Sequence, residues 1–343
     1  MRRTILACLL FLAAGVASAA NSYFLDRNGV LWQAGASSDG LVLTGQKDGA
    51  QVVRSVVPFP LSMPGINDSA IQVAADDLTG KVAVVWQRNW TSQASEIMLA
   101  VWANGDWERV TSLSQDLMNG PRNPEIQVTQ FSASIPDPAA PNDPSQATVL
   151  QDSYLHVVWW DGGDSGHPMY ALLRLTADPT DASALTEQNL DALTRLGFGC
   201  ANPASPDVLE HPLFASQGAH DRALVLFGSQ QLCQFQLVQV SFTVDTQPVT
   251  TTTDGGMTAS TQRRRSVPVF GVMKAFALSQ DMSMDGTRVV LGANLNPVAY
   301  RVNGPTIQYI TYGTAGWNPT RTLAVADGLT LDQAIPLVEN LAR

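Results

Sequence analysis

The chain has few cysteines, few histidines and an excess of acidic over basic side chains. Its 343 residues include 3 Cys and 4 His, and 20 Lys plus Arg stand against 30 Asp plus Glu, for a net charge of −10. Such a chain repels nucleic acid and anionic lipid, so neither is an expected partner. A structural zinc site needs about four Cys or His ligands at short spacing, and the sequence offers no such group.

The sequence also lacks a hydrophobic run of the roughly 20 residues that a membrane-spanning helix needs. The longest apolar run, Ile5 to Val16, is shorter, follows Arg2 and Arg3, and precedes the small residues Ala17-Ser18-Ala19. These are the three parts of a secretory signal. We therefore expect residues 1–20 to be a signal peptide, the product to be secreted or periplasmic, and no membrane span to follow.

Two cysteines, Cys200 and Cys233, would remain after export. An oxidising compartment favours their pairing as a disulfide. By the loop-entropy relation, such a bridge would stabilise the fold by about 3–4 kcal/mol.

Similar apolar segments recur along the chain. They are VLWQ at Val30–Gln33, KVAVVWQR at Lys81–Arg88, YLHVVWWD at Tyr154–Asp161, ALVLFGS at Ala223–Ser229 and a weaker copy, RVVLGAN, at Arg288–Asn294. A strand-rich unit that repeats every few tens of residues is typical of the blades of a β-propeller.

The second of these units predicts four short strands. They are Ile71–Ala75, Lys81–Gln87, Ile97–Ala103 and Trp107–Thr111, separated by turn-forming residues. We therefore predict an all-β fold. It would be a β-propeller of about five, or six, four-stranded blades over residues 21–329, with short helical insertions and a short helical tail at 330–343. The alternative is a two-sheet β-sandwich, since the segment Tyr154–Asp161 is apolar on both of its faces.

Two insertions interrupt the repeats, and a third segment is polar. Pro136–Gln151 is rich in Pro, Asp and Asn and predicts a surface loop, and the leucine spacing of Leu185–Leu196 predicts a short amphipathic helix. The polar run Thr250–Thr253 and the triplet Arg263-Arg264-Arg265 predict a solvated loop, for which the alternative interpretation is a protease-sensitive site.

The strand pattern resembles the sialidase-like propellers with BNR or Asp-box repeats. The resemblance rests on Pro124–Val128 followed by Leu155–Trp159, and on Ile97–Trp102 followed by Gly105-Asp106-Trp107. No Asp box is intact, because Ser37-Ser38-Asp39-Gly40 lacks the tryptophan and Ala315-Gly316-Trp317 lacks the aspartate. The resemblance therefore implies the propeller architecture.

A sialidase of this family would need three arginines, an acidic residue, and a tyrosine nucleophile that a neighbouring glutamate activates. The resemblance makes Tyr309 and Tyr312 the candidates for that nucleophile. Both also fit ordinary cross-strand aromatic residues, which are common in sheets.

Two further groups of residues are candidate binding sites. Trp90 and Trp160 could stack on a sugar ring, with blade packing as the alternative role of each. The segment Asp161–His167 gathers Asp161 and Asp164 on a turn, which suits Ca²⁺ but equally suits a polar hairpin connection. No other cofactor is indicated.

These observations predict a secreted, non-catalytic β-propeller that acts as a binding or scaffold module for glycans or for cell-envelope or extracellular proteins. The alternative is a sialidase-like glycoside hydrolase. The sequence leaves the oligomeric state undetermined.

Overall fold

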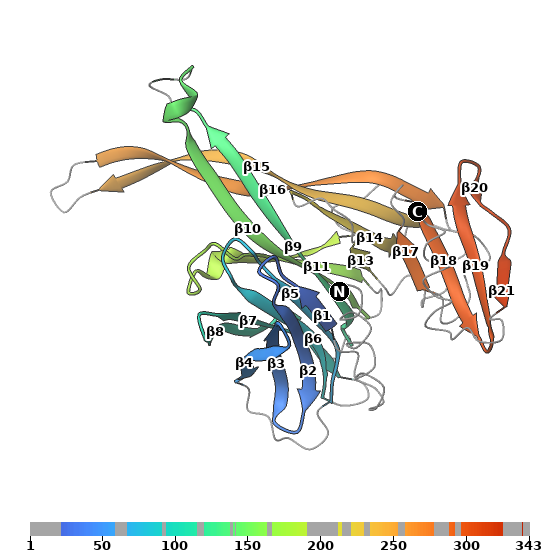
Figure 1. Cartoon of the computed structure of the whole chain (residues 1–343). Helices are drawn as coiled ribbons and strands as arrows, with labels where there is room; N and C mark the ends of the chain where they lie inside the picture. Colours follow the sequence, from blue (N-terminus) through green and yellow to red (C-terminus); the bar gives the residue numbers. More distant parts are fainter. Residues whose placement is uncertain are drawn as a thin grey trace.

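The computed structural model describes residues 22–58, 67–90, 94–114, 120–137, 140, 142–162, 167–190, 212–214, 221–229, 234–252, 258–277, 288–291, 296–324 and 338. Most of these residues lie in β-strands that form five antiparallel sheets (Figure 1). Two short 3-10 turns, η2 (Pro144–Gln146) and η3 (Ala182–Ala184), interrupt them. The predicted all-β fold is confirmed.

Each sheet is a meander in which strands that follow one another in the sequence pair. The first contains β1 (Ser22–Leu25), β2 (Leu31–Ser37), β3 (Gly40–Lys47) and β4 (Ala50–Val56). The second contains β5 (Asn67–Ala75), β6 (Val82–Asn89), β7 (Ser95–Ala103) and β8 (Asp106–Ser112). The third contains β9 (Arg122–Ile135), β10 (Thr148–Asp161), β11 (His167–Arg174) and β12 (Leu185–Asn189).

The last two sheets continue the pattern. The fourth contains β13 (Leu213–Phe214), β14 (Ala223–Ser229), β15 (Gln234–Thr252) and β16 (Thr258–Ala277). The fifth contains β17 (Arg288–Leu291), β18 (Pro297–Asn303), β19 (Thr306–Gly313), β20 (Gly316–Trp317) and β21 (Arg321–Ala324), and both β20 and β21 pair with β19.

The second sheet shows how local sequence fixes these strands. All four segments predicted there fall on β5 to β8, although β5 begins at Asn67, four residues before its predicted start, and the other ends differ by two residues or fewer. Asn104 and Gly105, between β7 and β8, both have positive φ angles of 52° and 92°. Two such residues are what a tight hairpin turn of the primed type requires, and Asn-Gly adopts it at little steric cost.

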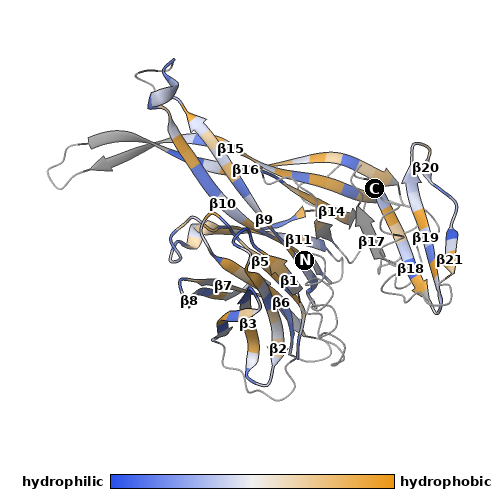
Figure 2. Cartoon of the chain, viewed as in Figure 1, coloured by the Kyte–Doolittle hydropathy of each residue, from blue (hydrophilic) through white to orange (hydrophobic). Residues whose placement is uncertain are grey.

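Successive sheets stack face to face through separate apolar clusters. Each sheet shares one apolar cluster with the next sheet along the chain, so that four clusters connect the five sheets in sequence order. Figure 2 shows the apolar residues concentrated along the strands of these sheets. This serial stacking is the blade-like packing that the repeats predict, whereas a sandwich would have two layers. Closure of the blades into a ring remains a prediction.

Strand β10 has two buried faces. Leu155, Val157 and Trp159 pack toward the second sheet, while Tyr154 and Val158 pack toward the fourth. Fully burying each large apolar side chain contributes about 1.5–3 kcal/mol. This explains why the segment is apolar at nearly every position rather than at every second one.

Two local predictions are wrong. Leu185–Asn189, expected to begin a helix, is β12, because pairing with β11 completes the third sheet and overrides the leucine periodicity. Thr250–Thr252 and Arg263–Arg265, expected in a loop, lie on β15 and β16, which pair as far as Thr252 and Thr258. Threonine is β-branched and favours strands.

Two other segments differ in part from expectation. Pro136–Gln151 begins as a loop containing η2, but its last residues start β10. Arg288–Leu291, the weak fifth copy, is the first strand in the order of its sheet, whereas the other four copies lie on second strands. In the tail, Val338 is helical and packs on the fifth sheet with Val298, Tyr300 and Ile307.

Long hairpins project from the third and fourth sheets. Strands β9 and β10 pair over their full length, and so do β15 and β16. Figure 1 shows the β15–β16 hairpin crossing the β9–β10 hairpin, and β10 contacts β16 there. The crossing brings together residues more than a hundred positions apart in the sequence and forms a cleft between the third and fourth sheets.

Gly45 on β3 allows the close approach of the Trp32 ring from β2. The two residues are paired in register, and a Cβ at Gly45 would lie 3.0 Å from the indole. Since Trp32 is a core residue, Gly45→Ala should lower the free energy of unfolding by about 1–3 kcal/mol. Urea denaturation measures this. Gly271→Ala is the control, because its Cβ meets no atom within 4 Å, and equal losses in the two variants would contradict the prediction.

Within the described residues, no helix is long and apolar enough to cross a membrane.

Candidate functional site: a cleft between the third and fourth sheets

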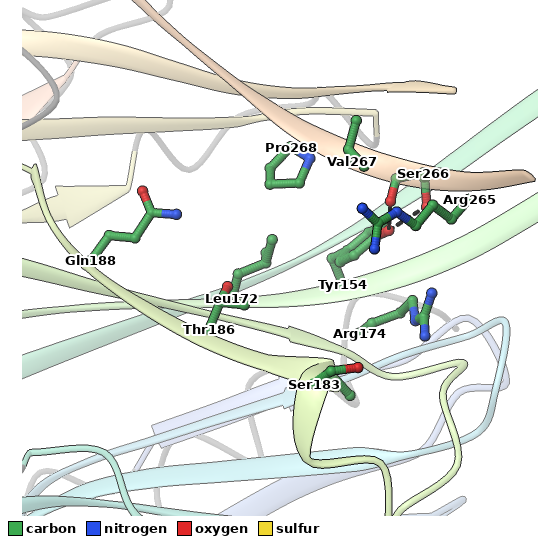
Figure 3. Close-up of a pocket in the computed structure, with 11 residues that line it drawn as sticks. Tyr154, Leu172, Arg174, Ser183, Thr186, Gln188, Arg265, Ser266, Val267 and Pro268 are labelled. Carbon is green, nitrogen blue, oxygen red and sulfur yellow. Dashed lines mark hydrogen bonds between the residues drawn. The ribbon is translucent and has the colours of Figure 1, made fainter. Parts of the chain in front are cut away.

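A cavity of about 350 Å³ lies where the third sheet faces β16 (Figure 3). Strands β10, β11 and β12 and the turn η3 form one wall, and β16 forms the other. The lining is mostly polar, with an apolar minority from Leu172, Ala184, Val267 and Pro268. The polar lining residues are Tyr154, Arg174, Ser183, Thr186, Gln188, Arg265 and Ser266. We call this cavity the interblade cleft.

A chain of hydrogen bonds closes the inner side of the cleft. Ser266 of β16 donates to Asp152 of β10, and the Tyr154 hydroxyl donates to Ser266. Thr176 donates to the other oxygen of Asp152 at 2.6 Å. Asp152 is almost fully buried, so these hydroxyls replace the water that its carboxylate loses. The chain therefore joins the two sheets and supports one edge of the cleft.

Tyr154 is held in its protonated form. Burial is the largest cause that raises its pKa, and the Asp152 charge also raises it, while the Ser266 hydrogen bond, Arg174 and Arg265 lower it, so that the pKa is about 12. Its ring also stacks on Phe242 of β15, with centroids 4.0 Å apart. At neutral pH its hydroxyl is thus a hydrogen-bonding group, not a phenolate nucleophile.

Two arginines lie at the same end of the cleft as Tyr154. Arg174 is opposite Tyr154 in the β10–β11 register, and Arg265 is next to Ser266 on β16. Figure 3 shows both guanidinium groups at one end, with Gln188 at the other. Gln188 pairs with Tyr170 on β11, four positions from Arg174, which agrees with that separation. The cleft therefore has a cationic end and a neutral, hydrogen-bonding end.

The rim of the cleft is tied to the second sheet. Arg109 of β8 donates to the carbonyl oxygens of Pro179 and Asp181, at 2.7 and 3.3 Å. The Asp181 side chain accepts from the backbone N–H and the hydroxyl of Ser183, and so caps η3. The segment that carries Ser183 is therefore fixed from two sides.

A second polar group lies behind the cleft on the same face of the third sheet. His156 Nε2 is 2.6 Å from the Thr129 hydroxyl, and Nδ1 is 2.7 Å from the Tyr170 hydroxyl. Burial lowers the pKa of His156 to about 3, so the imidazole is neutral at ordinary pH. Aromatic rings of Phe214 and Phe242 pack around it. The side chain is a satisfied core histidine.

The structure places the two candidate tryptophans in packed positions. Trp160 is 1% exposed and belongs to the cluster between the fourth and fifth sheets, so its expected availability for stacking on a ligand is wrong. Trp90 is half-buried, donates from its indole nitrogen to Glu96 at 2.9 Å, and has the Arg88 guanidinium 5.9 Å from its ring centre. A ligand role for Trp90 remains a prediction.

Tyr309 and Tyr312 both lie on β19 but contribute to different clusters. Tyr309 packs beside the group that contains Val338, whereas Tyr312 makes edge contacts with Phe276 and Trp317. The two hydroxyls therefore do not converge on one site. These contacts match the interpretation as cross-strand aromatic residues.

The other candidate sites are only partly described. Asp161 is paired with His167 at the end of the β10–β11 hairpin, while Asp164 lies outside the described residues. Over the described part of the chain, no group of three or more His, Cys, Asp or Glu could hold a metal ion. Cys200 and Cys233 also lie outside the described residues, so their disulfide stays a prediction.

No pattern in the sequence predicted the cleft itself. One signal was present: Asp152, Tyr154 and His156 place polar groups at alternate positions on one face of an otherwise apolar strand. Such a face is expected to meet hydrogen-bonding partners, because buried polar groups are rarely unsatisfied. The pattern on this strand does not identify the partners, which are Ser266, Thr129 and Tyr170.

Comparison with known proteins adds little. No protein-family model and no curated protein matches the chain. Among solved structures, it is similar to the crystal structure of 1,3Gal43A, an exo-beta-1,3-galactanase from Clostridium thermocellum, at 12% sequence identity and a TM-score of 0.25, over 91% of this chain and 76% of that chain. A likeness at that level carries no argument about function. The fold and the cleft define a class only: an all-β chain of stacked four-stranded sheets with a polar cleft between two of them.

Proposed function

We propose that this chain is a secreted, non-catalytic binding protein, and that one portion of a glycan binds in the interblade cleft. The observation that carries the proposal is the composition of the lining. It offers hydroxyl, amide and guanidinium groups with a few apolar side chains, and no carboxylate or imidazole among the described lining residues.

This composition favours binding over hydrolysis. Most glycosidases need two carboxyl groups on either side of the scissile bond, about 5 to 9.5 Å apart. Asp152 is close, but Thr176 and Ser266 already occupy its oxygens and it is buried behind the cleft. A sialidase-like mechanism would further need a tyrosine that a neighbouring glutamate activates, and the described lining residues include Tyr154 but no glutamate.

The size and chemistry of the cleft suit sugar rings. Its volume of about 350 Å³ is at the lower end of small-molecule sites, which span roughly 300–1,000 Å³. Leu172, Val267 and Pro268 offer apolar surface to the C–H face of a ring. Gln188, Thr186 and Tyr154 offer donors and acceptors to its hydroxyls.

Binding can be tested by filling the cleft. Thr186 is an exposed residue of β12 on the cleft wall, so Thr186→Trp should block the ligand while the sheet still forms. Calorimetric titration with neutral galactose and glucose oligosaccharides, oligogalacturonate and sulfated galactose oligosaccharides should find a ligand for the wild type. The Thr186→Trp variant should bind it at least about tenfold more weakly, since 1.4 kcal/mol of lost contact suffices.

Thr322→Trp is the matched control, because Thr322 is an exposed strand residue on β21, in a different sheet. It should bind as the wild type does. No binding by any saccharide of the panel, or equal binding by the Thr186→Trp variant, would overturn the proposal. Release of free sugar during the titration would favour the glycoside hydrolase instead.

A further inference from the structure

The strongest chemical asymmetry of the cleft is its pair of arginines. Arg174 comes from the third sheet and Arg265 from the fourth, and both line the same cavity beside Tyr154. The chain as a whole carries a net charge of −10, whereas the described lining of this cavity has two guanidinium groups and no carboxylate, and Asp181 and Asp245 each lie 3.5 Å from one of the arginines outside the lining. Guanidinium groups that line a cavity favour an anionic ligand.

Neither arginine is committed to a strong ion pair. Arg174 Nη2 lies 3.5 Å from Asp181, and Arg265 Nε lies 3.5 Å from Asp245. Each contact uses one nitrogen and lies at the long limit for a hydrogen bond, and the Arg265 pair is well exposed. A guanidinium carries five N–H donors, so both side chains keep donors for a ligand.

The two arginines are also held where a ligand could bridge them. Asp181, the partner of Arg174, is fixed by Arg109 of the second sheet and by its capping contacts with Ser183. Ser266, next to Arg265, is fixed by Asp152. The strands that carry the two arginines are therefore tied to each other across the cleft, and this limits the loss of order when a ligand binds between them.

We propose that the interblade cleft binds an acidic sugar residue, with its carboxylate or sulfate group between Arg174 and Arg265 and its hydroxyls toward Thr186 and Gln188. The inference rests on the proposed glycan-binding function and names its ligand class. Arginine suits both anions, because its planar fork matches their paired oxygens. The Tyr154 hydroxyl lies at the same end of the cleft as the two arginines and can contact the ring that bears the anion.

The experiment compares three matched probes by calorimetric titration with the purified full chain. These are oligogalacturonate, sulfated galactose oligosaccharide and neutral galactose oligosaccharide of the same length. At least one acidic probe should bind tenfold or more tightly than the neutral one, and the tighter of the two identifies the anion. Its affinity should fall as ionic strength rises, since an exposed ion pair is screened.

Substitution then locates the anion. Arg265→Gln and Arg174→Gln should each weaken the acidic probe about 10- to 100-fold, the usual effect of removing a charge-assisted hydrogen bond, and leave the neutral probe unchanged. Arg54→Gln is the control, because Arg54 in the first sheet is also 47% exposed and ion-paired. Circular dichroism confirms that each variant is folded, and Arg265→Lys serves as a second, milder variant at the same position.

Different results would contradict the acidic ligand and the glycan-binding function on which it rests. Equal affinity for neutral and acidic probes, or arginine variants that bind the acidic probe as the wild type does, would overturn the acidic ligand while glycan binding stands. Failure of all three probes, and of the neutral glucose oligosaccharides as well, would overturn the proposed function.

Discussion

Replacing Asp68 with alanine is expected to lower the free energy of unfolding by about 3–5 kcal/mol, because it removes one partner of a buried ion pair. Arg88 is fully buried, and its Nε and Nη2 donate to the two oxygens of Asp68 at 2.9 and 3.0 Å. Trp86 donates to the same carboxylate at 3.1 Å. The guanidinium also lies 5.7 Å from the ring centre of Trp86. Loss of the carboxylate would leave a buried cation with two donors unmatched.

The control for this prediction is Asp39→Ala in the first sheet. Asp39 accepts from Arg54 at 2.8 Å, but the two side chains are 56% and 47% exposed. Pairs of that kind contribute about 0–1 kcal/mol. Urea denaturation of the two variants measures both losses on the same scale. Similar losses for Asp68→Ala and Asp39→Ala would contradict the prediction that burial makes the loss of Asp68 more costly than the loss of an exposed partner.

A Glu125→Gln variant is expected to lose about 2–3 kcal/mol of stability between pH 6.5 and pH 4.5, and more than the wild type does over the same range. The loss comes from His156, whose pKa burial lowers from 6.5 to about 3. Below pH 6.5 the unfolded chain takes up a proton that the folded chain does not accept until about pH 3. The stability contributed by the neutral histidine is therefore present above pH 6.5 and declines as the pH falls.

Glu125 acts in the opposite direction in the wild type. Burial raises the pKa of its carboxyl group from 4.5 to about 7, so the folded chain holds a proton that the unfolded chain releases. Its contribution is fully present below pH 4.5 and is lost as the pH rises toward 7. Between pH 4.5 and 6.5 the two groups oppose each other, and removing Glu125 exposes the full effect of His156.

Urea denaturation at half-unit steps of pH measures both curves. The double variant Glu125→Gln, His156→Gln is the control, and its stability should vary less with pH than that of Glu125→Gln, because glutamine can bond to Thr129 and Tyr170 without titrating. If the stability of the wild type and of Glu125→Gln changed with pH in parallel, the prediction that Glu125 and His156 have opposite effects on stability would be wrong.

The strands and their stacking were largely predictable from local sequence. Four of the repeated segments occupy the second strand of successive sheets, and all four strands predicted for the second sheet are present, with ends that differ by at most four residues. Alternation of side chains and turn residues such as Asn104-Gly105 act over a few positions and are visible in the sequence. Predictions based on composition alone, such as a loop at Arg263–Arg265, failed because pairing with β15 outweighs local polarity.

The candidate site was not predictable in the same way. Trp160 is conspicuous in the sequence but lies in the core, whereas Arg174 and Arg265 have no distinctive local context. Whether a tryptophan is accessible depends on the neighbouring sheet, not on the strand that carries it. Here the fourth and fifth sheets cover Trp160.

By itself, the sequence determined the all-β class, the repeated four-stranded unit and the two-sided burial of Tyr154–Asp161, because each follows from residue periods and turns of short range. The tertiary structure alone decided that Ser266 meets Asp152, 114 positions away, and that Arg265 faces the cavity that Arg174 lines. Contacts of that range depend on how two hairpins cross after their sheets have stacked, and no local pattern encodes the crossing.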